Sequence, residues 1–153
     1  MASTTTRRTE RQERPQPSWR PIVSTTGDPA YSGVLQRNEA AAADARDMVR
    51  TCLSVWHLDQ LAEDLALVAT ELVANAVRHA RGEVVRVTVT RLARHRVRVA
   101  VTDRSKQMPQ LRVGDPLAET GRGLLLVDGT TAGRWGVIPY NWGKQVWAEV
   151  GTT

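Results

Sequence analysis

The sequence of 153 residues contains no phenylalanine, a single cysteine, and no apolar stretch long enough to cross a membrane. The lone Cys52 has no partner for an intramolecular disulfide, and its place in an apolar helical pattern indicates a buried thiol. The N-terminus carries arginines but lacks the apolar segment of a secretory signal. We therefore expect a cytoplasmic protein, without membrane attachment, that folds without disulfides.

The sequence also has fewer acidic than basic residues. Lys and Arg number 21 against 16 Asp and Glu, which gives a formal net charge of +5. Basic proteins of this size often meet nucleic acid or anionic partners. Much of the excess lies in the N-terminal tail and between Arg91 and Arg98, and neither run is interleaved with aromatic residues. A nucleic-acid surface is therefore less expected than an acidic protein or a nucleoside triphosphate as the partner.

The length fits one domain. Residues 1–18 have almost no large apolar side chain, and we expect them to form a disordered tail before a domain spanning 19–153. In that domain, residues 19–23 are typical of a short edge strand, and Gly27 to Pro29 of a turn. Residues 34–56 carry an alanine run and an apolar face that predict one long helix.

A second helix is expected from Asp59, as its N-cap, to about Ala80, with Gly82 closing it. Alternating valines predict an antiparallel hairpin, and two further strands are expected near the C-terminus. Between these hairpins lie a long polar loop and a Gly-x-Gly turn that opens an apolar helix. The strands are expected at 85–90, 97–102, 134–138 and 144–150, the loop at 104–119, and the turn at 121–123. The order predicts an α+β two-layer sandwich, with helices on one face of a mostly antiparallel mixed sheet.

Polar side chains flank the apolar stripe of the second helix. At about 100° per residue, Glu71 and Asn75 lie about 40° apart, with Arg78 beside them. A carboxylate and an amide one turn apart at the border of a core suit a metal ion or an activated water, although a solvated polar edge explains them as well. His79 projects close to the stripe, where a structural histidine at the helix end is the simpler interpretation.

Three phrases of the sequence together resemble the Bergerat-fold ATPases, which include histidine-kinase catalytic domains. They are Val68 to Ala80, Gly121 to Val127, and Gly143 to Glu149. Within that group the chain is most similar to the small bacterial anti-sigma factors that are also serine/threonine protein kinases. The likeness covers about residues 19 to 150, and its first phrase is the most specific.

The resemblance implies ATP and Mg²⁺ as cofactors and assigns a role to each matching residue. Asn75 would bind Mg²⁺ between the phosphates, Glu71 would act as the general base, and Asp103 would accept the adenine amine. The phosphates would meet the glycine turn and the helix N-terminus that follows it. The residues assigned to nucleotide binding beside Asn75 and Asp103 are Arg78, His79, Gly121, Arg122, Gly123 and Leu124. Residues 104–119 would form a lid over the nucleotide.

The same resemblance implies partners: a sigma factor and a small anti-sigma-factor antagonist that is phosphorylated on Ser or Thr, with a homodimer as a further possibility. The chain departs from the family pattern after Asp103, where Ser105 and Gln107 replace two glycines, and at Gln145, which takes the place of a threonine expected beside the adenine. These departures leave open an alternative, a catalytically weak or inactive partner-switching module of the same fold.

Overall fold

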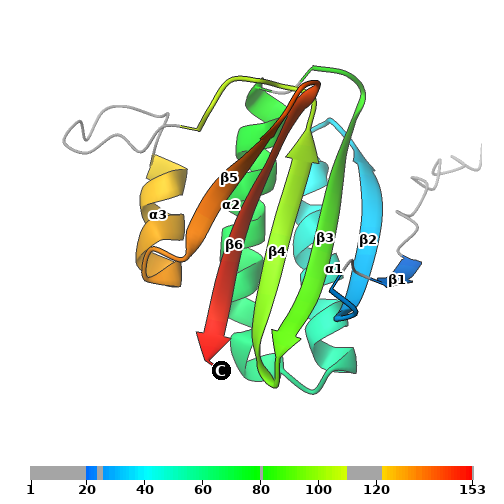
Figure 1. Cartoon of the computed structure of the whole chain (residues 1–153), viewed down its shortest axis with the longest axis vertical. Coiled ribbons are helices and arrows are strands. Elements are labelled where there is room, and N and C mark those ends of the chain that lie inside the picture. Colours follow the sequence, from blue (N-terminus) through cyan, green and yellow to red (C-terminus); the bar gives the residue numbers. More distant parts are fainter. Residues whose placement is uncertain (1–19, 24–25, 80, 110–121, 153) are drawn as a thin grey trace, which may run out of the picture.

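The computed structural model describes residues 20–23, 26–79, 81–109 and 122–152. Within these ranges one sheet carries helices on one of its faces (Figure 1). The strands are β1 (Arg20–Val23), β2 (Pro29–Gln36), β3 (Val84–Ala93), β4 (His95–Asp103), β5 (Trp135–Tyr140) and β6 (Gly143–Thr152). The helices are α1 (Ala41–Val55), a short 3-10 helix (Asp59–Leu61), α2 (Ala62–His79) and α3 (Arg122–Thr131). The predicted α+β sandwich is confirmed.

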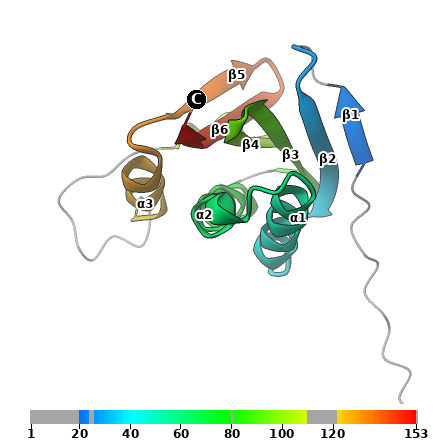
Figure 2. The ribbon, with the colours of Figure 1, turned by 90° about the horizontal axis from the view of Figure 1, so that it is seen from below.

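The sheet has the strand order β1-β2-β3-β4-β6-β5, and every neighbouring pair is antiparallel. Side chains alternate between its faces, so alternate valines point to one side and are buried there: Val85, Val87 and Val89 of β3, and Val97, Val99 and Val101 of β4. Figure 2 shows that α1, α2 and α3 all lie on the same side of the sheet. The core forms between these helices and the valine-rich face.

Helix α2 is central because it packs against α1, α3 and β4. Its apolar positions recur at helical spacing, and Leu65, Val68, Leu72 and Val73 are buried. In Figure 1 the C-terminal ends of α2 and β4 lie at the same end of the molecule. The arrangement brings the residues after Asp103 next to the last turn of α2.

The predicted long helix over residues 34–56 is wrong in its first part. Residues 29–36 form β2, which pairs with β3, and α1 begins only at Ala41. Leu35 is buried opposite Val85 on this strand and is not part of a helical face. A pairing between segments about 50 residues apart overrides the local helical pattern, and such pairing is not visible in a short window of sequence.

The ends of α2 differ slightly from the prediction. Asp59 opens a 3-10 turn whose N-cap is Leu58, so Asp59 is not the N-cap of an α-helix. At the other end, Gly82 has a φ of +86°, a conformation that favours glycine. Its carbonyl accepts a hydrogen bond from Nε of Arg37 at 2.8 Å, which ties the segment after α2 to the end of β2.

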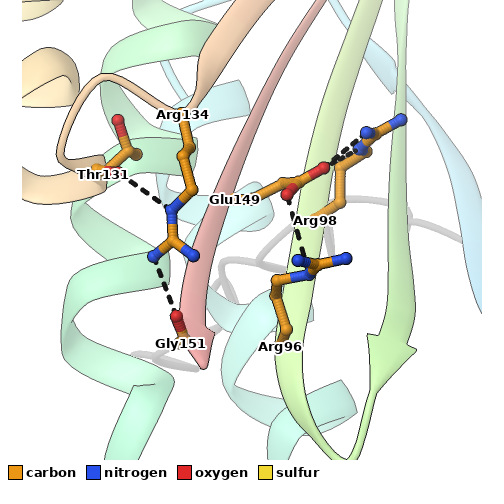
Figure 3. Close-up of polar contacts among 6 residues, drawn as sticks. All are labelled: Arg96, Arg98, Thr131, Arg134, Glu149 and Gly151. Atoms are coloured by element: carbon orange, nitrogen blue, oxygen red, sulfur yellow. Dashed lines mark hydrogen bonds and ion pairs between the residues drawn. The ribbon is translucent and has the colours of Figure 1, made fainter. Parts of the chain in front are cut away.

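The arginines of β4 make contacts within the protein (Figure 3). Arg98 donates to Glu149, which is only 8% exposed, and its guanidinium lies 4.5 Å from the ring centre of Trp147. Arg96 lies 3.8 Å from the same carboxylate. This part of the basic run is therefore engaged on the sheet and is not an open row of cations. Among the described helices, none is long and apolar enough to cross a membrane.

Candidate functional site

The polar edge of α2 forms one wall of the candidate site. Glu71 and Asn75 are both half-buried, one helical turn apart, as predicted. Within the described part of the chain neither side chain forms a hydrogen bond or an ion pair with another residue. A half-buried carboxylate and amide without protein partners are available to a ligand.

Gly123, in the first turn of α3, lies directly against Glu71. A Cβ atom at this glycine would overlap Oε2 of Glu71 and lie 3.4 Å from its Cδ. A Cβ at this position would force the carboxylate of Glu71 to turn away from α3. The contact brings together two predicted site residues that are 52 positions apart, and Asn75 lies one turn further along α2.

The other predicted end of the site is a buried ionic cluster around Asp103. Asp103 is 3% exposed and Lys144 is also 3% exposed. Nζ of Lys144 lies 3.0 Å from Oδ1 and 3.2 Å from Oδ2 of Asp103, and 3.1 Å from the carbonyl oxygen of Ser105. The backbone N–H of Ser105 donates to Oδ1 at 2.8 Å. The end of β4, the start of β6 and the loop after Asp103 therefore meet at this carboxylate.

The register of β4 and β6 explains why this lysine is present and corrects one expectation. Asp103 pairs with Lys144, whereas Thr102 pairs with Gln145. Successive residues point to opposite faces, so Gln145 lies on the far face, where it contacts Thr102 at 3.3 Å. The residue beside Asp103 on the last strand is thus Lys144 and not Gln145.

Of the two residues in place of the glycines, Ser105 packs on Asp103 and Gln107 is exposed. Ser105 is 6% exposed, and its hydroxyl accepts a hydrogen bond from the backbone N–H of Gln107 at 3.1 Å. A base reaches Asp103 only when this segment shifts. The carboxylate of Asp103 is therefore covered, through the backbone of Ser105 and through Lys144.

A polar pocket of about 360 Å³ lies beside this segment. His79 lines it from the end of α2, together with cationic side chains and the exposed Trp142. Its lining residues are His79, Arg81, Arg104, Ser105, Lys106, Gln107 and Trp142. Asn75 lies one turn before His79, so α2 runs from this pocket to the Glu71–Gly123 contact.

Arg78 faces a different region from His79. It lines a pocket of about 240 Å³ between α1 and α2, with Asn38, Glu39 and Val77 among its neighbours. The two residues assigned together from the sequence are thus separated by the helix geometry. Leu124 is 5% exposed and packs in the core, so its side chain is structural.

Parts of the predicted site lie outside the described residues. Gly121 and most of the predicted lid over 104–119 are among them, and the side chain of Arg122 is likewise not described. No motif in the sequence indicates Lys144 as a partner of Asp103. The signal that could have found it is the alternation of β6, which puts residues 144, 146, 148 and 150 on the core face.

The protein is thus a two-layer α+β domain. Its candidate site combines the polar edge of α2, the glycine in the first turn of α3 and the buried aspartate at the end of β4. The family model described as a histidine kinase-like ATPase domain matches residues 35–132. The chain belongs to this family. No curated protein matches the sequence. The matched range includes Glu71, Asn75, Asp103 and Gly123 but ends before Lys144.

Membership in a family of ATPase domains indicates ATP binding. The described residues fit such a ligand at two places. Gly123 lies in the first turn of α3, against Glu71, and the N-terminus of a helix offers backbone N–H donors to phosphate. The unpaired amide of Asn75 offers an oxygen to a hard cation.

Proposed function

We propose that the protein is an ATP- and Mg²⁺-dependent serine/threonine protein kinase that acts on a small anti-sigma-factor antagonist, and that it sequesters a sigma factor. The observation that carries the proposal is the alignment along α2. Glu71 meets Gly123 at one point, Asn75 follows one turn later, and His79 follows after a further turn. The family match supports the nucleotide, and the resemblance of the three phrases supports the partners.

In this mechanism the protein's own groups position the reactants. The Asn75 amide oxygen would hold Mg²⁺, which would supply positive charge for the phosphates, and the first turn of α3 would offer N–H donors to them. Glu71 accepts the proton of the substrate hydroxyl while the hydroxyl oxygen forms a bond to the γ-phosphorus. The bond from that phosphorus to the β-phosphate oxygen breaks, and ADP leaves. Catalysis depends on positioning and electrostatics, as phosphoryl transfer generally does.

Calorimetric titration with ATP and Mg²⁺ tests the nucleotide site. Asn75→Ala should weaken binding about tenfold or more, which corresponds to about 1.4 kcal/mol. Gln60→Ala removes an exposed amide before the same helix and should bind as the wild type does. Equal affinities for the wild type and Asn75→Ala would remove the assigned magnesium site.

Transfer of radiolabel from ATP to an antagonist protein tests the kinase role. Glu71→Ala should abolish the transfer while leaving ATP binding. Glu63→Ala, an exposed carboxylate in the first turn of α2, is the matched control and should transfer normally. Retained transfer in Glu71→Ala would exclude this carboxylate as the base.

The covered Asp103 favours a second candidate function. A carboxylate held by Lys144 and Ser105 is less accessible than an open one. The protein would then keep the fold, and nucleotide as a structural ligand, and act by binding partners without catalysis. Measured ATP binding without transfer to any cognate antagonist would establish this alternative.

A further inference from the structure

Lys144 is a buried charged residue to which neither the family match nor the resemblance gives a role. An ammonium group has three N–H donors, and here three acceptors surround it. They are the two carboxylate oxygens of Asp103 and the carbonyl oxygen of Ser105. The lysine therefore both neutralises Asp103 and holds the segment that covers it.

The cluster leaves Asp103 with little acceptor capacity. An ionised carboxylate has about four acceptor positions. Oδ1 accepts from Lys144 and from the backbone N–H of Ser105, and Oδ2 accepts from Lys144. One position remains, on Oδ2, so the carboxylate is able to take a single further N–H donor.

The two purines differ in what they require from such a group. Adenine presents one amine N–H beside a ring acceptor, N1. Guanine presents two N–H donors side by side, which a free carboxylate accepts with both oxygens. Lys144 leaves too few acceptor positions for both donors of guanine, and a buried N–H without an acceptor is costly.

The shift of Ser105 that admits a base also frees a donor. The carbonyl and the N–H of Ser105 belong to different peptide units, so the carbonyl can turn away while the N–H stays on Oδ1 of Asp103. The N–H of Lys144 that donated to this carbonyl is then left without a partner. N1 of adenine is a hydrogen-bond acceptor, as the carbonyl is. It lies beside the amine whose N–H would donate to Asp103. The carbonyl of Ser105 thus takes the hydrogen bond of Lys144 that N1 of adenine would accept.

We propose that Lys144 is a second base-reading residue, which donates to N1 of adenine while Asp103 accepts from the amine, and that this pair selects adenine over guanine. The inference rests on the proposed function in one respect, the placement of the purine at Asp103. It adds a specificity-determining lysine on the last strand, beyond the range matched by the family model.

The test is equilibrium binding of ATP and GTP to the wild type and to Lys144→Met. The lost hydrogen bonds involve charged groups, so the ratio of ATP affinity to GTP affinity should fall about tenfold to a hundredfold in the variant. Gln145→Met is the matched control: it places the same side chain one residue along β6, on the opposite face of the sheet. This variant should keep the wild-type ratio.

A nucleotide analogue isolates the contact with N1. ATP with carbon in place of N1 should bind the wild type about tenfold more weakly than ATP does. Lys144→Met should bind the analogue and ATP alike, because the donor is gone. Lys144→Gln, which keeps a donor without the charge, replaces Lys144→Met if the latter unfolds, and its ATP to GTP ratio should also fall.

The outcomes separate the two proposals. If the wild type binds neither ATP nor GTP, the nucleotide site itself fails and the base-reading role fails with it. If the wild type binds ATP but the Lys144 variants weaken ATP and GTP by the same factor, only the base-reading role of Lys144 is overturned. The base-reading role is supported if the Lys144 variants lose affinity for ATP more than for GTP, and if Lys144→Met binds ATP and the analogue equally.

Discussion

At the scale of single residues, Gly123 is the glycine of the candidate site that packs directly against the carboxylate of Glu71. The atom that a Cβ would meet first is the carboxylate oxygen of Glu71, at the far end of a flexible side chain. The carboxylate would turn away and α3 would stay in place. The glycine therefore protects the position of a proposed catalytic group more than it protects the fold.

Gly123→Ala should accordingly reduce phosphoryl transfer about a hundredfold, a size typical of misplacing a reacting group by about 1 Å. Gly129→Ala lies on the same helix, where an added Cβ meets nothing within 4 Å, and should transfer at the wild-type rate. Single-turnover transfer assays on both variants provide the measurement. Similar losses in the two variants would point to helix perturbation and would contradict the contact with Glu71.

Cys52 is buried, as expected from its place in the helical pattern of α1. Burial raises the pKa of its thiol to about 12, and a backbone hydrogen bond only partly opposes this effect. In the unfolded chain the thiol titrates near its ordinary value of 9.0. Above that pH the unfolded state binds fewer protons than the folded state, so the thiol's contribution to stability is lost between about pH 9 and pH 12.

We therefore expect urea unfolding midpoints to decline over this pH range, and to decline less in Cys52→Ala, after allowance for the lower starting stability of that variant. A disulfide reagent at neutral pH should label the wild type only at the rate at which α1 opens, since the thiolate is the reactive form. Rapid labelling of the native protein would contradict the burial.

At the scale of elements, α3 is attached to the sheet by a hydrogen bond as well as by its apolar side. Nε1 of Trp135, at the start of β5, donates to Oδ1 of Asp128 at 2.9 Å. Leu124 and Val127 supply the buried apolar contacts of the helix. Because α3 carries Gly123, this attachment also sets the position of the glycine turn.

Asp128→Ala should lower the free energy of unfolding by about 1 kcal/mol, the usual effect of losing one hydrogen bond to a partly buried donor. Asp128→Asn keeps an acceptor oxygen in the same place and should be close to the wild type. Urea denaturation of the three proteins, with the slope checked for constancy, gives the values. Equal destabilisation by both substitutions would show that the indole contact is not what the aspartate supplies.

At the scale of the whole molecule, nucleotide binding should stabilise the fold through mass action. A ligand at a hundred times its dissociation constant adds about 2.7 kcal/mol, which corresponds to about 5–10 °C in the midpoint of thermal unfolding for a domain of this size. ATP with Mg²⁺ should give this shift, and ATP with a chelator a smaller one. In Asn75→Ala the two shifts should be equal, and a metal-dependent shift in that variant would place the cation elsewhere.

The elements of strong periodicity were predictable from the sequence, whereas the elements defined by pairing were not. The valines of β3 and β4 alternate clearly, and α2 has a regular apolar stripe, so both were expected in place. Residues 34–36 continue into a helix-forming alanine run, and only their pairing with β3 makes them part of a strand. Local secondary-structure propensity contains no information on a pairing partner that lies about 50 residues away.

The candidate site divides in the same way. The helical spacing of Glu71 and Asn75 follows from 3.6 residues per turn, and the sequence alone was sufficient for it. The contact of Gly123 with Glu71 and the pairing of Asp103 with Lys144 depend on how α3 and β6 pack and register. A shift of one residue in that register would exchange Lys144 for Gln145 beside Asp103.

The sequence by itself determined the class of this protein: its valine-rich strands, the polar edge of α2 and the phrases that place it among the ATPase domains are local patterns with fixed periods. The tertiary structure decided which charges meet. Side chains from distant segments become neighbours only through sheet register and helix packing, and for this reason the buried lysine at Asp103 emerged from the fold and not from the motifs.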